Sequence, residues 1–116
     1  MNGDKQARLG IINDHLQPGE EILYDVLALL LDPGGGLKAW EAEGHLLLSD
    51  RRLIFGTPEH GILLNIRTRQ IKVPVRVRNR ILMAHLLVPL EDGTIHRLVV
   101  NRRSARAIAD AINRVV

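Results

Sequence analysis

The sequence predicts a mainly β domain that is closed by one C-terminal amphipathic helix and preceded by a short extra helix. Apolar runs broken by turn residues fill the region from Glu20 to Val100, which is typical of successive strands. Apolar residues after Asn101, and those before Pro18, recur instead with a helical period. The chain has 116 residues, 46% hydrophobic and 25% charged, so one globular domain is expected.

The N-terminal helix is predicted over Asp4–Leu16. Leu9, Ile12 and Leu16 fall at i, i+3 and i+7, which places them on one stripe of a helix. The sequence Gln17-Pro18-Gly19 then ends the helix. The apolar stripe is expected to pack against the rest of the domain or against another chain.

Seven strands are expected between the two helices. Clusters of Asp, Pro, Gly and Ser separate the apolar runs and predict the turns. The predicted strands are Glu21–Leu31, Leu37–Ser49, Arg52–Gly56, Ile62–Thr68, Ile71–Asn79, Ile81–Pro89 and Thr94–Val100.

The alternation of apolar residues changes phase near Gln70. Leu64 and Ile66 are apolar at even positions, whereas the valines that follow Ile71 are apolar at odd positions. Side chains alternate strictly between the faces of a strand, so this change requires a bulge or a turn between two strands. Pro74 favours an edge or a bulge, because proline cannot donate a ladder hydrogen bond.

The C-terminal helix is predicted from one apolar stripe. Its residues at helical spacing are Ala105, Ile108, Ala109, Ile112 and Val116. Asn101 is the predicted N-cap, since its side chain can accept a hydrogen bond from a first-turn amide.

One segment carries a family resemblance. Glu43–Phe55, which includes Ser49-Asp50-Arg51-Arg52 and ends in Leu-Ile-Phe, resembles the signature hairpin of bacterial pleckstrin-homology-like (PH-like) and GRAM-like domains. Leu16–Leu23 is similar to the entry segment of the same family. The resemblance implies a seven-stranded, strongly bent antiparallel barrel with one open end covered by the C-terminal helix. Residues 20–116 then form the barrel and its helix, and residues 1–19 an added helix of the same single domain.

The signature hairpin is expected to be structural. Ser49 and Asp50 can bond the backbone amides of their own turn. Arg51 or Arg52 can pair with Asp50 or with nearby carbonyls, while Phe55 belongs to the core.

Charge is distributed unevenly along the chain. Residues 1–50 contain three basic and nine acidic residues, a net charge of −6, whereas residues 51–116 contain thirteen basic and four acidic residues, a net charge of +9. The halves can attract each other within one domain or between subunits, or the basic half can bind an anionic partner.

Several classes of function are not expected. The chain has no cysteine, and its five histidines lack metal-ligand spacing, so no metal site and no cofactor are predicted. Neither Ser49 nor Ser104 lies in a nucleophile motif, so an enzyme is not expected. Aromatic residues make up only 3% of the chain, which leaves few stacking platforms and makes nucleic acid an improbable partner.

The sequence also bears on location. The apolar stretch Ile22–Leu31 is too short to span a bilayer, and the first residues do not resemble a secretory signal. The expected location is the cytoplasm, including the inner face of the membrane as a peripheral site.

Two functional interpretations remain. The favoured one is a non-catalytic interaction module that contacts proteins and self-associates as a homo-oligomer, through exposed strand edges or the apolar segment Ile81–Leu90. The same segment is also explained by burial under the helix. The alternative is peripheral binding of anionic membrane lipid headgroups through a basic strand face. The residues of this basic row are Lys72, Arg76, Arg78 and Arg80, which share parity in one predicted strand.

Overall fold

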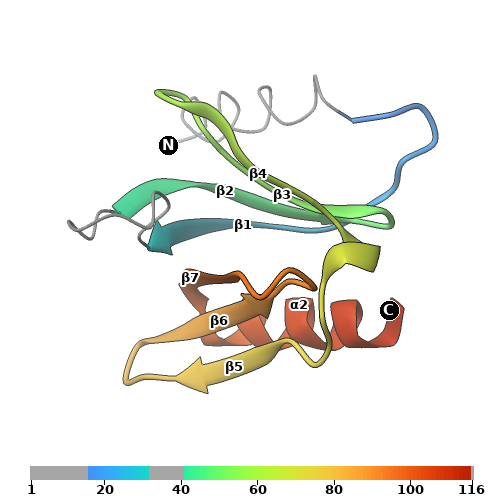
Figure 1. The fold of residues 1–116 in the computed structure, drawn as a ribbon. Coiled ribbons are helices and arrows are strands. Elements are labelled where there is room, and N and C mark those ends of the chain that lie inside the picture. The colour runs from blue at the N-terminus through green and yellow to red at the C-terminus, as the bar shows by residue number, and fades with distance from the viewer. Residues whose placement is uncertain (1–15, 32–40, 116) are drawn as a thin grey trace.

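The computed structural model describes residues 16–31 and 41–115. Within these ranges seven strands are followed by one helix (Figure 1). The elements are β1 (Ile22–Leu31), β2 (Glu41–Ser49), β3 (Arg52–Thr57), β4 (Gly61–Arg67), a 3-10 turn η1 (Thr68–Gln70), β5 (Arg76–Asn79), β6 (Met83–Pro89), β7 (Ile95–Asn101) and α2 (Arg102–Val115).

All seven strands belong to one antiparallel sheet with the order β4-β3-β2-β1-β7-β6-β5. The sheet is strongly bent, so that β1 to β4 form one half and β5 to β7 the other (Figure 1). The end of β1 joins the halves, because Leu29–Leu31 pair with β7 as well as with β2. The predicted fold class, mainly β with a C-terminal helix, is confirmed.

The main core lies between the two halves and α2. Alternate residues of β2, such as Leu46 and Leu48, point into it, as do Leu53 and Phe55 of β3. The helix contributes its predicted stripe, whose buried members are Ala105, Ile108, Ala109 and Ile112. Val116 lies outside the described residues.

A smaller apolar cluster lies on the outer face of the first half. Leu47 of β2 and Ile54 of β3 are fully buried there, and Leu16 and Ile62 pack against them. Leu16 is the last residue of the predicted N-terminal helix, and the remainder of that helix lies outside the described residues. The beginning of the predicted strand Leu37–Ser49 also lies outside them.

The phase change near Gln70 coincides with η1, which confirms a turn at this point. The predicted strand Ile71–Asn79 is wrong at its start, because β5 begins at Arg76. Ile71 makes only an isolated bridge to Leu90. The backbone N–H and C=O of Val75 pair with the side-chain amide of Asn113 in α2, at 2.8 and 3.2 Å. The helix therefore takes the place of a strand partner at this edge.

The predicted strand Ile81–Pro89 is also wrong at its start. Arg80 N donates to Met83 O at 2.8 Å, which closes a hairpin turn around Ile81 and Leu82. β6 therefore begins at Met83, and the two preceding apolar residues form the tip of the β5–β6 hairpin.

Candidate binding surfaces

The signature hairpin is organised by the Ser49 side chain. Its Oγ accepts hydrogen bonds from the backbone amides of Arg51 and Arg52, both at 3.1 Å. The same hydroxyl donates to Glu20 Oε2. The Oδ1 of Asp50 accepts instead from the backbone N of Glu21 at 3.0 Å, outside its own turn. The hairpin therefore anchors the segment that leads into β1.

Arg52 completes this anchor with a bidentate ion pair. Its Nε and Nη2 donate to the two carboxylate oxygens of Glu20, each at 2.9 Å. The Glu20 side chain is 0% exposed and that of Arg52 is 11% exposed. The hydrogen bond from Arg52, followed by those from Ser49 and the Gln17 backbone, lowers the pKa of Glu20 from 4.5 to about 2, although burial opposes the shift. These contacts hold the Arg52 guanidinium against the segment that leads into β1.

The four residues of the basic row are all exposed. Arg76 and Arg78 lie in β5, whereas Lys72 precedes this strand and Arg80 follows it. Val77, which alternates with the arginines, packs against the core, so Arg76 and Arg78 face away from it.

The outer face of β5, β6 and β7 extends this basic surface. The strand register places Arg76 beside Leu87 and Leu87 beside Arg97, which is also exposed. We call this surface the outer β5–β7 face. Its outward positions are Arg76, Arg78, Met83, His85, Leu87, Pro89, Ile95, Arg97, Val99 and Asn101. Three of these ten residues are arginines and none is acidic, so the outward side chains of this face carry a net positive charge.

The tip of the β5–β6 hairpin projects from one end of this face (Figure 1). Ile81 is 92% exposed and Leu82 is 83% exposed. Next to the tip, Met83 and Leu27 are partly exposed and line a shallow groove of about 410 Å³. Tight turns favour Gly, Asn and Asp, so Ile and Leu at this position serve neither the turn nor the core.

The first turns of α2 place further arginines near the tip. Met83 pairs with Asn101, the residue directly before the helix. Asn101 Oδ1 accepts from Ser104 N at 2.8 Å, as expected for an N-cap. Exposed Arg102, Arg103 and Arg106 then line a groove of about 500 Å³ against β5, together with Val77, Asn79 and Asp110.

Sequence reasoning did not include Arg97 in the basic surface, and it placed Ile81 and Leu82 in a strand rather than at an exposed tip. The alternation of strand Thr94–Val100 would have placed Arg97 outward, opposite Leu98. The predicted strands Ile71–Asn79 and Ile81–Pro89 left only one residue between them. A tight hairpin needs two, and that conflict could have identified the exposed tip.

No helix in the described part of the chain is both long and apolar enough to cross a membrane. Among the same residues, no group of three His, Cys, Asp or Glu side chains is placed to hold a metal ion.

Comparison with known structures gives the fold. The N-terminal PH domain of Vps36 superposes with a TM-score of 0.64 at 15% identity, over 86% of this chain and 81% of that one. The C-terminal domain of an unknown protein from Leishmania infantum superposes with a TM-score of 0.66 at 13% identity, over 91% and 92% of the two chains. The fold is PH-like. No protein-family model and no curated protein matches the sequence.

Proposed function

We propose that this PH-like chain is a non-catalytic binding module that docks on an anionic membrane surface through the tip of its β5–β6 hairpin and its outer β5–β7 face. The observation that carries the proposal is the exposure of Ile81 and Leu82, 92% and 83%, at a tip whose turn includes Arg80 and whose adjoining strand carries Arg78. Apolar side chains of this kind can enter the interfacial layer while the arginines contact phosphate groups. The bacterial, GRAM-like relationship stays a prediction from the Glu43–Phe55 hairpin.

The arginines and the apolar tip contribute to the free energy of membrane binding in different ways. Each arginine near an anionic surface contributes about 1 kcal/mol. Burial of each apolar side chain at the tip contributes about 1.5 kcal/mol. Arg80 closes the turn at the tip, Arg78 follows along the outer face of β5, and Arg76 lies at the far end of that strand. Arg102 directly follows Asn101, which pairs with Met83 next to the tip. A bilayer could therefore meet the apolar tip and several cations together.

Self-association has less support from the contacts within the chain. The core of the domain buries three residues of β6 completely, Ala84, Leu86 and Val88. This burial accounts for the apolar character of Ile81–Leu90 after the two tip residues. At the β5 edge of the sheet, Asn113 occupies the backbone groups of Val75. At the β4 edge, the Gln70 side chain accepts from the backbone N of Arg67 at 2.9 Å. Both edges are thus partly covered, which disfavours pairing with a second copy.

Vesicle co-sedimentation tests the proposal. The protein should bind vesicles of phosphatidylserine and phosphatidylcholine, and bind much less to phosphatidylcholine alone. Replacement of both tip residues, Ile81→Ser with Leu82→Ser, should weaken binding about 100-fold, from the loss of about 3 kcal/mol. Replacement of Arg76 and Arg78 by Ala should weaken it about 30-fold, from about 2 kcal/mol.

Two matched variants test whether loss of an apolar side chain or of two positive charges elsewhere on the surface also weakens vesicle binding. Ile22→Ser removes a partly exposed apolar side chain of β1, and the pair Arg67→Ala with Arg69→Ala removes the same charge from a different surface. Both should bind vesicles nearly as well as the unmodified chain. Equal binding to neutral and anionic vesicles, or full binding by the tip variant, would refute the proposal.

A further inference from the structure

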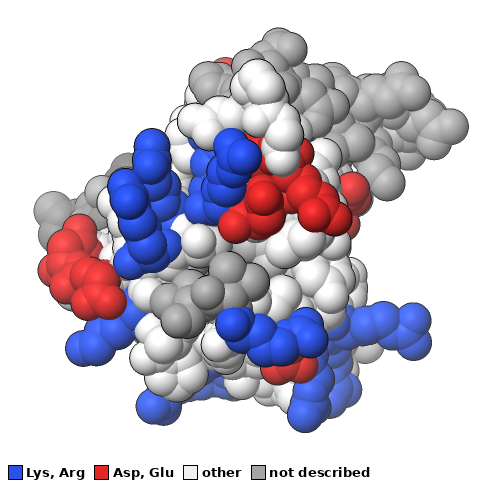
Figure 2. All heavy atoms as spheres, turned by 90° about the vertical axis from the view of Figure 1, so that its right-hand side faces the viewer, with Lys and Arg blue, Asp and Glu red and all other residues white. Residues whose placement is uncertain are grey.

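A second basic surface lies on the side of the molecule opposite the hairpin tip. A groove of about 530 Å³ opens between the β2–β3 turn and the end of β4 with η1. In Figure 1 these elements lie on the right, whereas the β5–β6 tip lies on the left. Figure 2 faces this side and shows Lys and Arg side chains gathered next to an acidic patch. The groove is lined by Gln17, Asp50, Arg51, Arg52, Asn65, Arg67, Thr68, Arg69 and Gln70.

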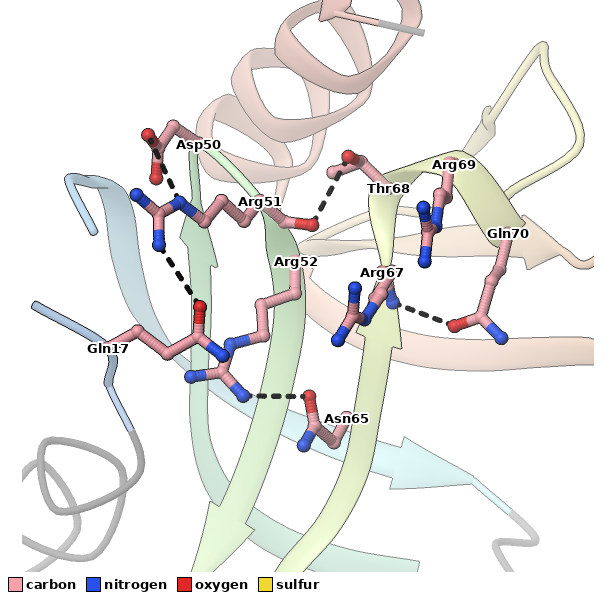
Figure 3. A pocket seen from close by; sticks show the side chains of 9 residues that line it. All are labelled: Gln17, Asp50, Arg51, Arg52, Asn65, Arg67, Thr68, Arg69 and Gln70. Atoms are coloured by element: carbon pink, nitrogen blue, oxygen red, sulfur yellow. Dashed lines mark hydrogen bonds and ion pairs between the residues drawn. The ribbon is translucent and has the colours of Figure 1, made fainter. Parts of the chain in front are cut away.

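The four arginines of the groove differ in their partners. Arg52 is held by Glu20, as described above. Arg51 donates to Gln17 Oε1 at 3.0 Å, and its Nε lies 4.0 Å from Asp50 Oδ2. The guanidinium groups of Arg67 and Arg69 form no ion pair with any described residue (Figure 3). The groove therefore holds two positive charges that the described chain does not neutralise.

The walls of the groove are tied together by hydrogen bonds. Arg51 O in the β2–β3 turn accepts from Thr68 N at 2.9 Å and from Thr68 Oγ1 at 3.2 Å. This contact fixes η1, and with it the backbone of Arg67 and Arg69 on either side of Thr68. Gln70 Oε1 accepts from Arg67 N, which orients the Gln70 amide, and its NH₂ group donates to none of the described residues (Figure 3). The positions of the donors are thus set before any ligand arrives, which reduces the entropy lost on binding.

The composition of the groove indicates the ligand. Guanidinium groups bind carboxylate and phosphate with paired hydrogen bonds. None of the nine lining residues is aromatic, so nucleic-acid bases would find no stacking platform. The volume of about 530 Å³ falls within the roughly 300–1,000 Å³ typical of ligand sites. A membrane held at the hairpin tip would not reach this side, and only this last point rests on the function proposed above.

We propose that the groove binds an acidic segment of a partner protein, with Arg67 and Arg69 pairing to its carboxylate or phosphate groups. Arg51 would contribute a third cation, and Gln70 and Asn65 would donate from their amides. The domain would then hold an acidic protein segment on the side that faces away from the membrane.

Fluorescence anisotropy with short labelled peptides tests this inference. The probes are a hexaglutamate peptide, a peptide of the same length with two phosphoserines, and a hexalysine peptide as the negative control. At least one of the first two should bind, and comparison between them distinguishes carboxylate from phosphate as the recognised group. Arg67→Ala with Arg69→Ala should weaken that binding at least tenfold.

The control variant is Arg76→Ala with Arg78→Ala, which removes the same charge from the outer β5–β7 face. It should bind the acidic peptide as the unmodified chain does, while losing vesicle binding. Three results would overturn the inference: no binding of either acidic peptide at low salt, equal loss in the two variants, or tighter binding of a single-stranded oligonucleotide. Both variants are also measured for vesicle binding. The two assays therefore distinguish a groove that does not bind acidic peptides from an outer β5–β7 face that does not bind membranes.

Discussion

Replacement of Glu20 by Gln should remove a pH-dependent part of the stability. The Glu20 carboxylate is fully buried under Arg52 and accepts hydrogen bonds from Ser49 and from the backbone of Gln17. Its pKa is about 2 in the folded chain, against an ordinary value of 4.5. This difference corresponds to about 3 kcal/mol of folding free energy, because one pKa unit is equivalent to about 1.4 kcal/mol.

The lowered pKa of Glu20 sets the direction in which stability changes with pH. A carboxylate that is more acidic in the folded state stabilises folding fully above its unfolded pKa, near 4.5, and this stabilisation is lost as pH falls through about 2. At pH 7 the Glu20→Gln chain should be about 3 kcal/mol less stable than the unmodified chain, and the two should converge between pH 5 and pH 2.

Urea denaturation at pH 7, 5, 3 and 2 measures both unfolding free energies. The matched control is Glu21→Gln, which changes the exposed neighbouring carboxylate and should alter stability by less than about 0.5 kcal/mol at each pH. A Glu20→Gln difference that stays constant from pH 7 to pH 2, or that is absent at pH 7, would show that the ion pair is not the cause.

Two further substitutions test the packing of the fold. Gly44→Ala would press its Cβ against the backbone carbonyl oxygen of Gly56 in the neighbouring strand and place it 2.9 Å from Phe55 Cζ, so it should destabilise the chain by about 3 kcal/mol in denaturant unfolding; an unchanged midpoint would contradict these contacts. Asn113→Leu should cost about 1–3 kcal/mol, because the backbone groups of Val75 lose their partner, and amide hydrogen exchange of Val75 should accelerate. Protection of Val75 that survives this change would refute the assigned role of Asn113.

Local periodicity predicted most of the fold. Strand alternation and turn residues identified seven strands, and the helical stripe from Ala105 to Ile112 identified the face of α2 that is buried. The phase change near Gln70 located η1. These features depend on side chains that are close in the sequence, so a single sequence contains the information.

Contacts between distant residues could not be predicted in this way. Glu20 and Arg52 are separated by 32 positions, and no local pattern indicates their pairing. The late start of β5 depends on Asn113, which reaches Val75 from 38 positions away. The same limit applies to the groove near Arg67, because it forms only where η1 meets the β2–β3 turn.

The basic row was predicted from parity alone and is exposed, but its apolar tip was not foreseen. Ile81 and Leu82 are apolar and adjoin an apolar run, so hydrophobicity predicts that they are buried residues of a strand. Their exposure follows from the geometry of a two-residue turn, which the hydrogen bond from Arg80 to Met83 establishes.

The central claim, that the β5–β6 tip enters an anionic membrane, is tested most directly by a fluorescent label at the tip. The chain contains no cysteine, so Leu82→Cys gives one site for an environment-sensitive dye, and Arg69→Cys gives a matched site in the opposite groove. With phosphatidylserine vesicles the dye at position 82 should shift to shorter wavelength and brighten, while the dye at position 69 should not change. No shift at position 82, or equal shifts at both positions, would contradict the proposed orientation.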